Sequence, residues 1–177
     1  MNTTTVAETQ EDTQHRQGQY GFTVLEAVIV LIIAGFIISN VAKMSSKGFS
    51  SSKLTDTEQN LLVMRADIQG MFTSSNDYSG LDNALVIKAG LVPKSFIKAN
   101  TLVNAWGGDI NIATDASNAS WSIEFTKIPQ EECTKLAVFQ PDAWLNVSVN
   151  GSDVSGGDVS AATNACGESN TITFVTR

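Results

Sequence analysis

The sequence has almost no histidine. Of its 177 residues only His15 is a histidine, and it lies in the polar first 21 residues. Nucleophilic sites of the Ser-His and Cys-His types need an imidazole base, and many metal sites need imidazole ligands. We therefore expect residues 22–177 to form no such site, and we predict that the protein is not an enzyme and carries no cofactor.

Clusters of lysine and arginine are missing too. The chain has 11 basic and 18 acidic residues, which gives a formal net charge of −7. The first 21 residues contribute −2, so that residues 22–177 carry −5. Phosphate contacts need clustered Lys and Arg side chains. We therefore expect no nucleic-acid partner.

Cysteine is also scarce, with Cys133 and Cys166 as the only two. An even pair in an exported domain favours a disulfide bond. Such a bond would stabilise the fold by about 3–4 kcal/mol through chain entropy. The alternative is two unpaired buried thiols. Neither cysteine belongs to a CxxC pair or has a histidine nearby, and we predict no metal site.

Charge is almost absent from one long stretch. Residues 22–42 read FTVLEAVIVLIIAGFIISNVA, and Glu26 is their only charged side chain. About 20 apolar residues at a rise of about 1.5 Å match a hydrocarbon core about 30 Å thick. We predict a membrane-spanning helix here, because a bilayer cannot satisfy an open backbone. The stretch is longer than the apolar part of a secretory signal peptide, and no small-residue cleavage site follows it.

Glu26 is the most informative residue of this stretch. A carboxylate inside a spanning helix costs roughly 2.5–3.5 kcal/mol, so it calls for a partner. A cut between Gly21 and Phe22 would create an α-amino group four residues before Glu26. On an axially displaced neighbouring subunit, that ammonium could neutralise the carboxylate during assembly. The alternative places Glu26 at the level of the lipid headgroups.

The sequence GFTVLE (21–26), with its apolar continuation, resembles the class III signal of type IV prepilins. The resemblance implies that a prepilin peptidase of the inner membrane cuts after Gly21 and methylates Phe22. It also implies that Glu26 steers subunits into a growing filament. The implied partners are other pilin subunits, the peptidase and the inner-membrane assembly machinery. The sequence identifies no receptor on a host or recipient surface.

The same resemblance implies two locations and a division of the chain. The precursor is expected as a single-pass inner-membrane protein with its C-terminal head in the periplasm, and the assembled form as an extracellular pilus filament. Residues 1–21 form the leader, 22–53 the apolar helix with a Ser-rich joint, and 54–177 the head. The leader is longer than that of type IVa pilins, which favours the IVb branch.

The residue pattern predicts an α+β fold, in which one long helix packs on an antiparallel sheet. The resemblance to type IV pilins implies that this is the pilin fold, with a C-terminal region bounded by the two cysteines. A helical apolar stripe extends the helix to about residue 72, at Leu54, Leu61, Met64, Ile68 and Met71. A second helix is predicted over 82–89, ended by Gly90. Alternation predicts strands near 110–112, 121–128, 144–150 and 172–175, with one apolar face at Leu145, Val147 and Val149. Residues 135–140 could form a strand or a helix, and a helix that starts after the acidic Glu131 and Glu132 is favoured. Residues 151–170 are predicted as an exposed loop.

Two local features bear on function. The run 104–108, NAWGG, resembles a turn of type IVb pilins, including those of thin conjugative pili, and Trp106 is expected in the core. Asp153 and Asp158 could bind calcium, although solvated loop charge is the simpler interpretation.

Two other classes of protein stay open. A pseudopilin of a type II secretion system shares the leader pattern, although the cysteine pair favours a pilus. A membrane-anchored exported binding protein or enzyme is the second alternative, and it must treat the pattern at 21–26 as an accident.

Overall fold

The structure is a computed structural model that describes the backbone of residues 23–177 and the side chains of 23–34 and 50–177. The chain divides into two units, Met1–Met44 and Ser45–Arg177. The predicted leader, 1–21, and Phe22 lie outside the described residues.

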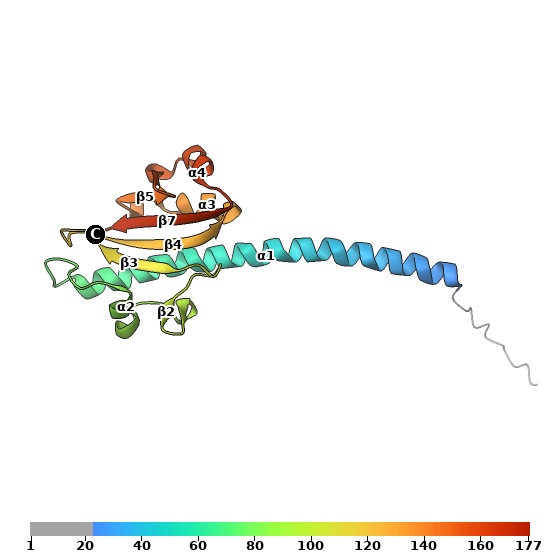
Figure 1. Cartoon of the computed structure of the whole chain (residues 1–177), viewed down its shortest axis with the longest axis horizontal. Helices are drawn as coiled ribbons and strands as arrows, with labels where there is room; N and C mark the ends of the chain where they lie inside the picture. Colours follow the sequence, from blue (N-terminus) through green and yellow to red (C-terminus); the bar gives the residue numbers. More distant parts are fainter. Residues whose placement is uncertain (1–22) are drawn as a thin grey trace, which may run out of the picture. The chain divides into compact units, whose positions relative to one another are not determined.

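Helix α1, Val24–Phe72, contributes to both units (Figure 1). At its start Thr23 accepts hydrogen bonds from the N–H of Glu26 at 3.3 Å and from the N–H of Ala27 at 3.1 Å. These bonds satisfy amides that have no partner inside the helix. The predicted continuation of the helix to about residue 72 is confirmed.

No helix among the described residues is both long enough and apolar enough to cross a membrane. Within the predicted span, 22–42, Phe22 and the side chains of 35–42 lie outside the described part of the chain.

The apolar stripe of α1 forms one side of the core of the head. Leu61, Met64 and Ile68 are fully buried, and Leu54 is nearly so. Thr57, between Leu54 and Leu61, is also fully buried. Its hydroxyl is satisfied there, because it donates to the carbonyl of Lys53 at 2.7 Å.

The prediction is wrong for the last residue of the stripe. Met71 is exposed, with 45% of its surface accessible. The core position at this end of α1 belongs to Phe72, whose ring lies 5.2 Å from that of Tyr78. Phe72 follows Ile68 by four residues and lies nearer the centre of the buried face than Met71 does, so the helical period itself favours Phe72 as the core residue.

An antiparallel sheet of five strands in the order β3-β4-β7-β5-β6 forms the other side of the core (Figure 1). Its strands are β3, Ile110–Thr114; β4, Trp121–Pro129; β5, Asn146–Val149; β6, Ser152–Asp153; and β7, Ser169–Thr176. The last strand of the chain therefore lies in the middle of the sheet, between β4 and β5. The predicted α+β class is confirmed.

One face of the sheet is buried, as the period of two requires. It carries Ile110, Ile112, Trp121, Ile123, Phe125, Val147, Val149, Ile172 and Phe174, all at most 5% exposed. These side chains share a single core cluster with the stripe of α1. Leu145 was predicted on this face but is 50% exposed, because β5 begins one residue after it.

Between α1 and the sheet the chain forms a short helix and a small hairpin. Helix α2, Asn83–Ala89, begins after Asp82, whose carboxylate accepts from the N–H of Leu85 at 2.7 Å. It ends at Gly90 in the left-handed conformation with φ 70°, as predicted. A 3-10 turn, η1, Lys94–Phe96, leads to a hairpin of β1, Ile97–Lys98, and β2, Thr101–Leu102.

The helix predicted at 135–140 is displaced. Helix α3 is Gln130–Ala137, and Glu131 and Glu132 lie inside its first turn instead of before it. Acidic side chains in a first turn are stabilised by the helix dipole, which explains the earlier start.

The loop predicted at 151–170 is partly wrong. Besides β6 and the 3-10 turns η2, Pro141–Ala143, and η3, Ser155–Gly157, the C-terminal region holds helix α4, Val159–Ala165. Asp158 begins this helix, since its carboxylate accepts from the N–H groups of Ser160 at 2.8 Å and Ala161 at 3.1 Å.

Candidate functional site

The residues predicted for assembly belong to the N-terminal segment. Gly21 and Phe22 lie outside the described residues. Glu26 is in the first turn of α1 and is exposed. The apolar side chains near it are exposed as well, and the largest fractions are those of Val24 at 83% and Leu25 at 72%. Such a continuous apolar surface is typical of a segment that contacts lipid or another chain.

The predicted disulfide is confirmed. Cys133 of α3 and Cys166, which follows α4, are bonded with an S–S distance of 1.99 Å and a Cα–Cα distance of 6.0 Å. Both are buried, at 0% and 6% exposure. Their bond joins the end of α4 to the helix that precedes β5, and so bounds the C-terminal region as predicted.

Two asparagines fix the backbone beside the disulfide. Asn170, 1% exposed, donates to the carbonyls of Ile128 at 2.9 Å and Gly167 at 2.8 Å. Its carbonyl oxygen accepts from the N–H of Gly167 at 2.7 Å and from the amide of Asn150 at 2.9 Å. Asn150 also donates to the carbonyl of Ala165 at 3.0 Å. The loop that carries Cys166 is thus held from both sides.

Sequence reasoning missed this pair of asparagines. One signal was present, because Asn150-Gly151 is a dipeptide that favours a tight turn with positive φ. Their φ angles are 51° and 83°. Nothing in the sequence pattern, however, places the amide of Asn150 against that of Asn170.

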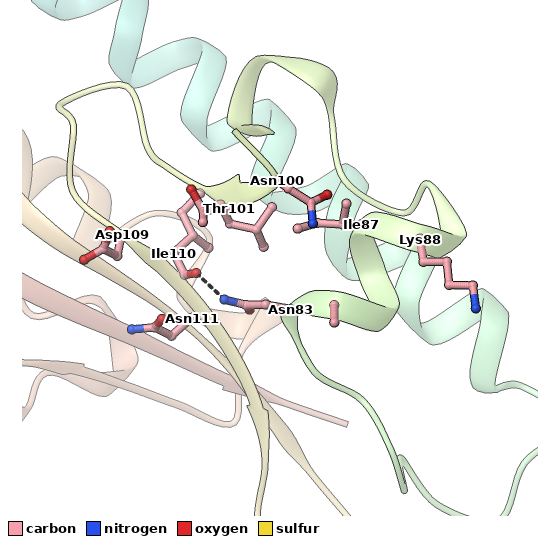
Figure 2. Close-up of a pocket in the computed structure, with 10 residues that line it drawn as sticks. Asn83, Ile87, Lys88, Asn100, Thr101, Asp109, Ile110 and Asn111 are labelled. Carbon is pink, nitrogen blue, oxygen red and sulfur yellow. Dashed lines mark hydrogen bonds between the residues drawn. The ribbon is translucent and has the colours of Figure 1, made fainter. Parts of the chain in front are cut away.

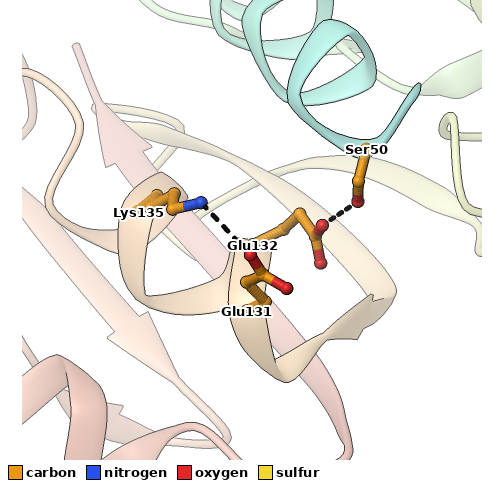
Figure 3. Close-up of polar contacts among 4 residues, drawn as sticks. All are labelled: Ser50, Glu131, Glu132 and Lys135. Carbon is orange, nitrogen blue, oxygen red and sulfur yellow. Dashed lines mark hydrogen bonds and ion pairs between the residues drawn. The ribbon is translucent and has the colours of Figure 1, made fainter. Parts of the chain in front are cut away.

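A polar contact links α1 to α3 (Figure 3). Glu132 is only 4% exposed, and its carboxylate accepts a hydrogen bond from the hydroxyl of Ser50. Beside it, Lys135 pairs with Glu131 at 3.8 Å on the exposed side of α3. Burial raises the pKa of Glu58 on α1, and the positive charge of Lys135 opposes that rise. The Ser-rich joint predicted at the end of the segment 22–53 therefore contacts, through Ser50, the helix that carries Cys133.

The run 104–108 forms a turn around one amide. Asn104, 2% exposed, donates to the carbonyl of Thr126 at 2.7 Å and accepts from the N–H groups of Trp106 at 2.9 Å and Gly108 at 3.0 Å. A Cβ on Gly108 would lie 1.9 Å from the carbonyl oxygen of Thr126, so only glycine fits there. Trp106 is half-buried and packs against the core.

The two aspartates considered for calcium have local partners. Asp153 accepts from the N–H of Ser155 at 2.9 Å, and hydrogen bonding from Ser155 lowers the pKa of Asp153. Asp158 begins α4. Among the described residues, no group of three or more His, Cys, Asp or Glu side chains is placed to hold a metal ion.

A groove of about 700 Å³ lies between α2, the β1–β2 hairpin and β3 (Figure 2). Its polar lining includes Asn83, Lys88, Asn100 and Asp109. Sequence reasoning placed no functional residue here, because the groove is formed by segments that are brought together only by the fold.

A long helix that leads into a small antiparallel sheet, with a disulfide bounding the C-terminal region, defines a pilin-type subunit. The family model described as PilS N terminal matches residues 51–177, and the chain belongs to this family of type IV pilins. The resemblance to type IV prepilins is thereby confirmed at the level of the family.

Two relatives are pilins of named filaments. The chain is 21% identical over 164 residues to the major structural subunit of bundle-forming pilus of Escherichia coli O127:H6, covering 90% of this chain and 78% of the relative. It is 25% identical over 147 residues to the toxin coregulated pilin of Vibrio cholerae serotype O1, covering 78% and 66%.

A solved structure shares the fold. The crystal structure of TcpA, a type IV pilin from the El Tor biotype of Vibrio cholerae, matches with a TM-score of 0.52 and 14% identity. The match covers 71% of this chain and 99% of that one. At this identity it supports the architecture of the head and nothing finer.

Proposed function

We propose that this chain is a structural subunit that polymerises into a type IV pilus, a surface filament serving adhesion, aggregation or mating contact. The observation that carries the proposal is the family match over residues 51–177, which contain the whole head. The N-terminal part of α1 supports it, because its exposed apolar side chains need a partner that the described residues of the chain do not provide.

The proposed life of the subunit has two stages. The precursor is held in the inner membrane by residues 22–42, with the head in the periplasm. Prepilin peptidase then cuts between Gly21 and Phe22 and methylates the new terminus, after which the assembly machinery moves the subunit into the filament. There, neighbouring apolar helices replace lipid around the segment.

Glu26 sets the register in this proposal. In the apolar filament core an unpaired carboxylate is costly, and a carboxylate that meets the ammonium of Phe22 on a neighbouring subunit is neutralised. Its position in the first turn of α1, four residues after Phe22, supports the pairing. In this proposal one axial displacement between neighbouring helices brings the Glu26 carboxylate and the Phe22 ammonium together.

The test is Glu26→Ala, with filaments counted by electron microscopy. We expect filament numbers to fall about tenfold or more, because each 1.4 kcal/mol of lost pairing changes an equilibrium about tenfold. Leu25→Ala is the matched control, since it shortens an adjacent exposed side chain of α1 without changing the charge. Normal filament numbers in Glu26→Ala would refute the register role of the carboxylate.

Mass spectrometry of the mature N-terminus tests the processing step. We expect a methylated terminus at Phe22 in the native chain and in Glu26→Ala. An intact Met1 terminus, or a cut near Lys43, would contradict the prepilin proposal. Long surface fibres that react with an antibody to this chain distinguish a pilus subunit from a pseudopilin.

A further inference from the structure

Strand β3 lies at one edge of the sheet and pairs only with β4. Successive residues of a strand present their N–H and C=O groups to opposite sides. The backbone groups of Ile110 and Ile112 therefore point away from β4, together with those of Thr114. An edge of this kind is a template on which another chain can pair.

The side chain of Asn83 covers this edge. Its amide nitrogen donates to the carbonyl of Ile110 at 2.9 Å, and its carbonyl oxygen accepts from the N–H of Ile112 at 2.8 Å. One side-chain amide thus satisfies an acceptor and a donor two residues apart, as the N–H and C=O of a single residue in a parallel neighbouring strand would. Figure 2 shows Asn83 reaching from α2 towards Ile110.

The position of Asn83 is fixed by the start of α2. It is the first residue of that helix, directly after Asp82, whose carboxylate holds the first turn through the N–H of Leu85. The groove of about 700 Å³ runs along residues 109–111 beside it, so there is open space in front of the edge. Helix α2 and the β1–β2 hairpin form the other walls of this groove, and within it the amide of Asn83 bonds the two backbone groups of the edge.

We propose that Asn83 closes the β3 edge and thereby prevents a second copy of this chain from pairing with it. The opposite edge, β6, has only two residues, one of them the charged Asp153, and needs less protection. The β3 sequence, INIAT, combines β-branched residues without charge or proline and is the stronger template of the two edges.

A second copy is the relevant partner for two reasons. The edge can pair with itself in antiparallel register, because a two-fold contact presents the same donors and acceptors from both chains. The need for protection rests on the proposed function, since a filament holds many identical heads at high local concentration. The test below uses unassembled chains, so it can fail without affecting the pilus proposal, and the reverse also holds.

The experiment is hydrogen–deuterium exchange at the Ile112 amide, followed by NMR on the full-length chain in detergent micelles at low and high protein concentration. In Asn83→Ala we expect exchange at Ile112 about tenfold or more faster at low concentration, because its acceptor is gone. At high concentration we expect protection to return and the sedimenting mass to increase, because a second copy supplies the acceptor.

Two further variants make the result decisive. Asn111→Ala, on the same strand, removes an amide that donates to the side chain of Glu124 at 2.9 Å and not to the free edge. The Ile112 amide of this variant should exchange as it does in the native chain. Asn83→Leu keeps the volume of residue 83 and should behave as Asn83→Ala. Protection of Phe174 in the central strand β7 reports whether the head is folded.

Three outcomes would overturn the proposal. The first is native protection of Ile112 in Asn83→Ala at low concentration, which would mean that Asn83 does not cover the edge. The second is lasting exposure of Ile112 at high concentration without an increase in mass, which would mean that the open edge does not pair. The third is loss of Phe174 protection in both variants, which would make Asn83 a folding residue.

Discussion

At the scale of single residues, a few buried polar side chains hold the loops of the head. Asn104 and Asn170 are each at most 2% exposed and bond backbone groups of segments far away in the sequence. A buried amide that loses one partner keeps the cost of desolvation, so each of these side chains constrains its loop strongly. The apolar core gives the head its stability, and these amides select one arrangement of its connections.

Glu58 is a residue at which stability depends on pH. Burial raises its pKa above the ordinary value of 4.5, and Lys135 opposes the rise. The folded chain therefore binds a proton at this site more tightly than the unfolded chain. The stability that Glu58 contributes is fully present below its pKa in the unfolded chain. It is lost as the pH rises through its pKa in the folded chain.

We predict that Glu58→Gln removes this loss of stability with rising pH. The free energy of unfolding of the variant relative to the native chain should increase as the pH rises from about 4.5, and then level off once the native carboxyl has ionised. Urea unfolding followed by tryptophan fluorescence across this pH range measures the difference. Glu131→Gln is the control, because it alters an exposed partner of the same Lys135 and should change stability by less than about 1 kcal/mol. A difference that decreases with rising pH would contradict the assignment.

At the scale of elements, the sequence predicts what a repeating pattern encodes. The stripe of α1 and the alternation in β3 and β4 are regular, because one face of each must meet a shared core. The start and end of α2 are predictable from Asp82 and Gly90, which have local bonding roles. The class of fold and the disulfide follow from these local signals together with the cysteine count.

The missed elements are short and depend on contacts outside themselves. Helix α4 has seven residues and buries only Ala162, so it has no apolar period to detect. Its one available signal was Asp158 followed by an alanine-rich run. The covering of β3 by Asn83 and the asparagine pair beside Cys166 join segments distant in the sequence, and no local pattern encodes them.

The disulfide makes a prediction about these short elements. Replacing both cysteines, Cys133→Ser with Cys166→Ser, should lower the free energy of unfolding by about 3–4 kcal/mol, because the closed loop separates the cysteines by 33 residues. Urea unfolding of the oxidised native chain and of the variant measures this loss.

The loss of stability should also be concentrated around the disulfide. Amides of α4 should exchange faster in the variant than amides of β4, since α4 has little core of its own and depends on the bond for its position. Treatment with a thiol reductant serves as the control, since it should bring the native chain to the stability of the variant and leave the variant unchanged. Equal stability of the native chain and the variant in oxidising buffer would show that the asparagine network alone holds the region.

At the scale of the whole molecule, charge and apolar surface are divided along the chain. The segment 22–42 carries one charged residue, and the remaining charge up to residue 177 lies in the joint and the head. Residues 22–177 have a formal net charge of −5. In the filament proposed above, with its apolar helical core, we expect the acidic heads to face the medium and to repel those of neighbouring filaments.

This division predicts that lateral association of purified filaments depends on salt. Raising the ionic strength from about 0.01 M to about 0.15 M shortens the Debye length from about 30 Å to about 8 Å, so that the repulsion between heads is screened. Light scattering and low-speed sedimentation should both increase over this range.

The combination of Asp67→Asn and Glu168→Gln, two exposed positions, changes the charge of residues 22–177 from −5 to −3 and should bring association at lower salt. Asn164→Gln, also exposed, preserves the charge and should follow the native curve. Association that is equal at all salt concentrations, or unaffected by removing the two charges, would mean that specific contacts and not net charge control how the filaments meet.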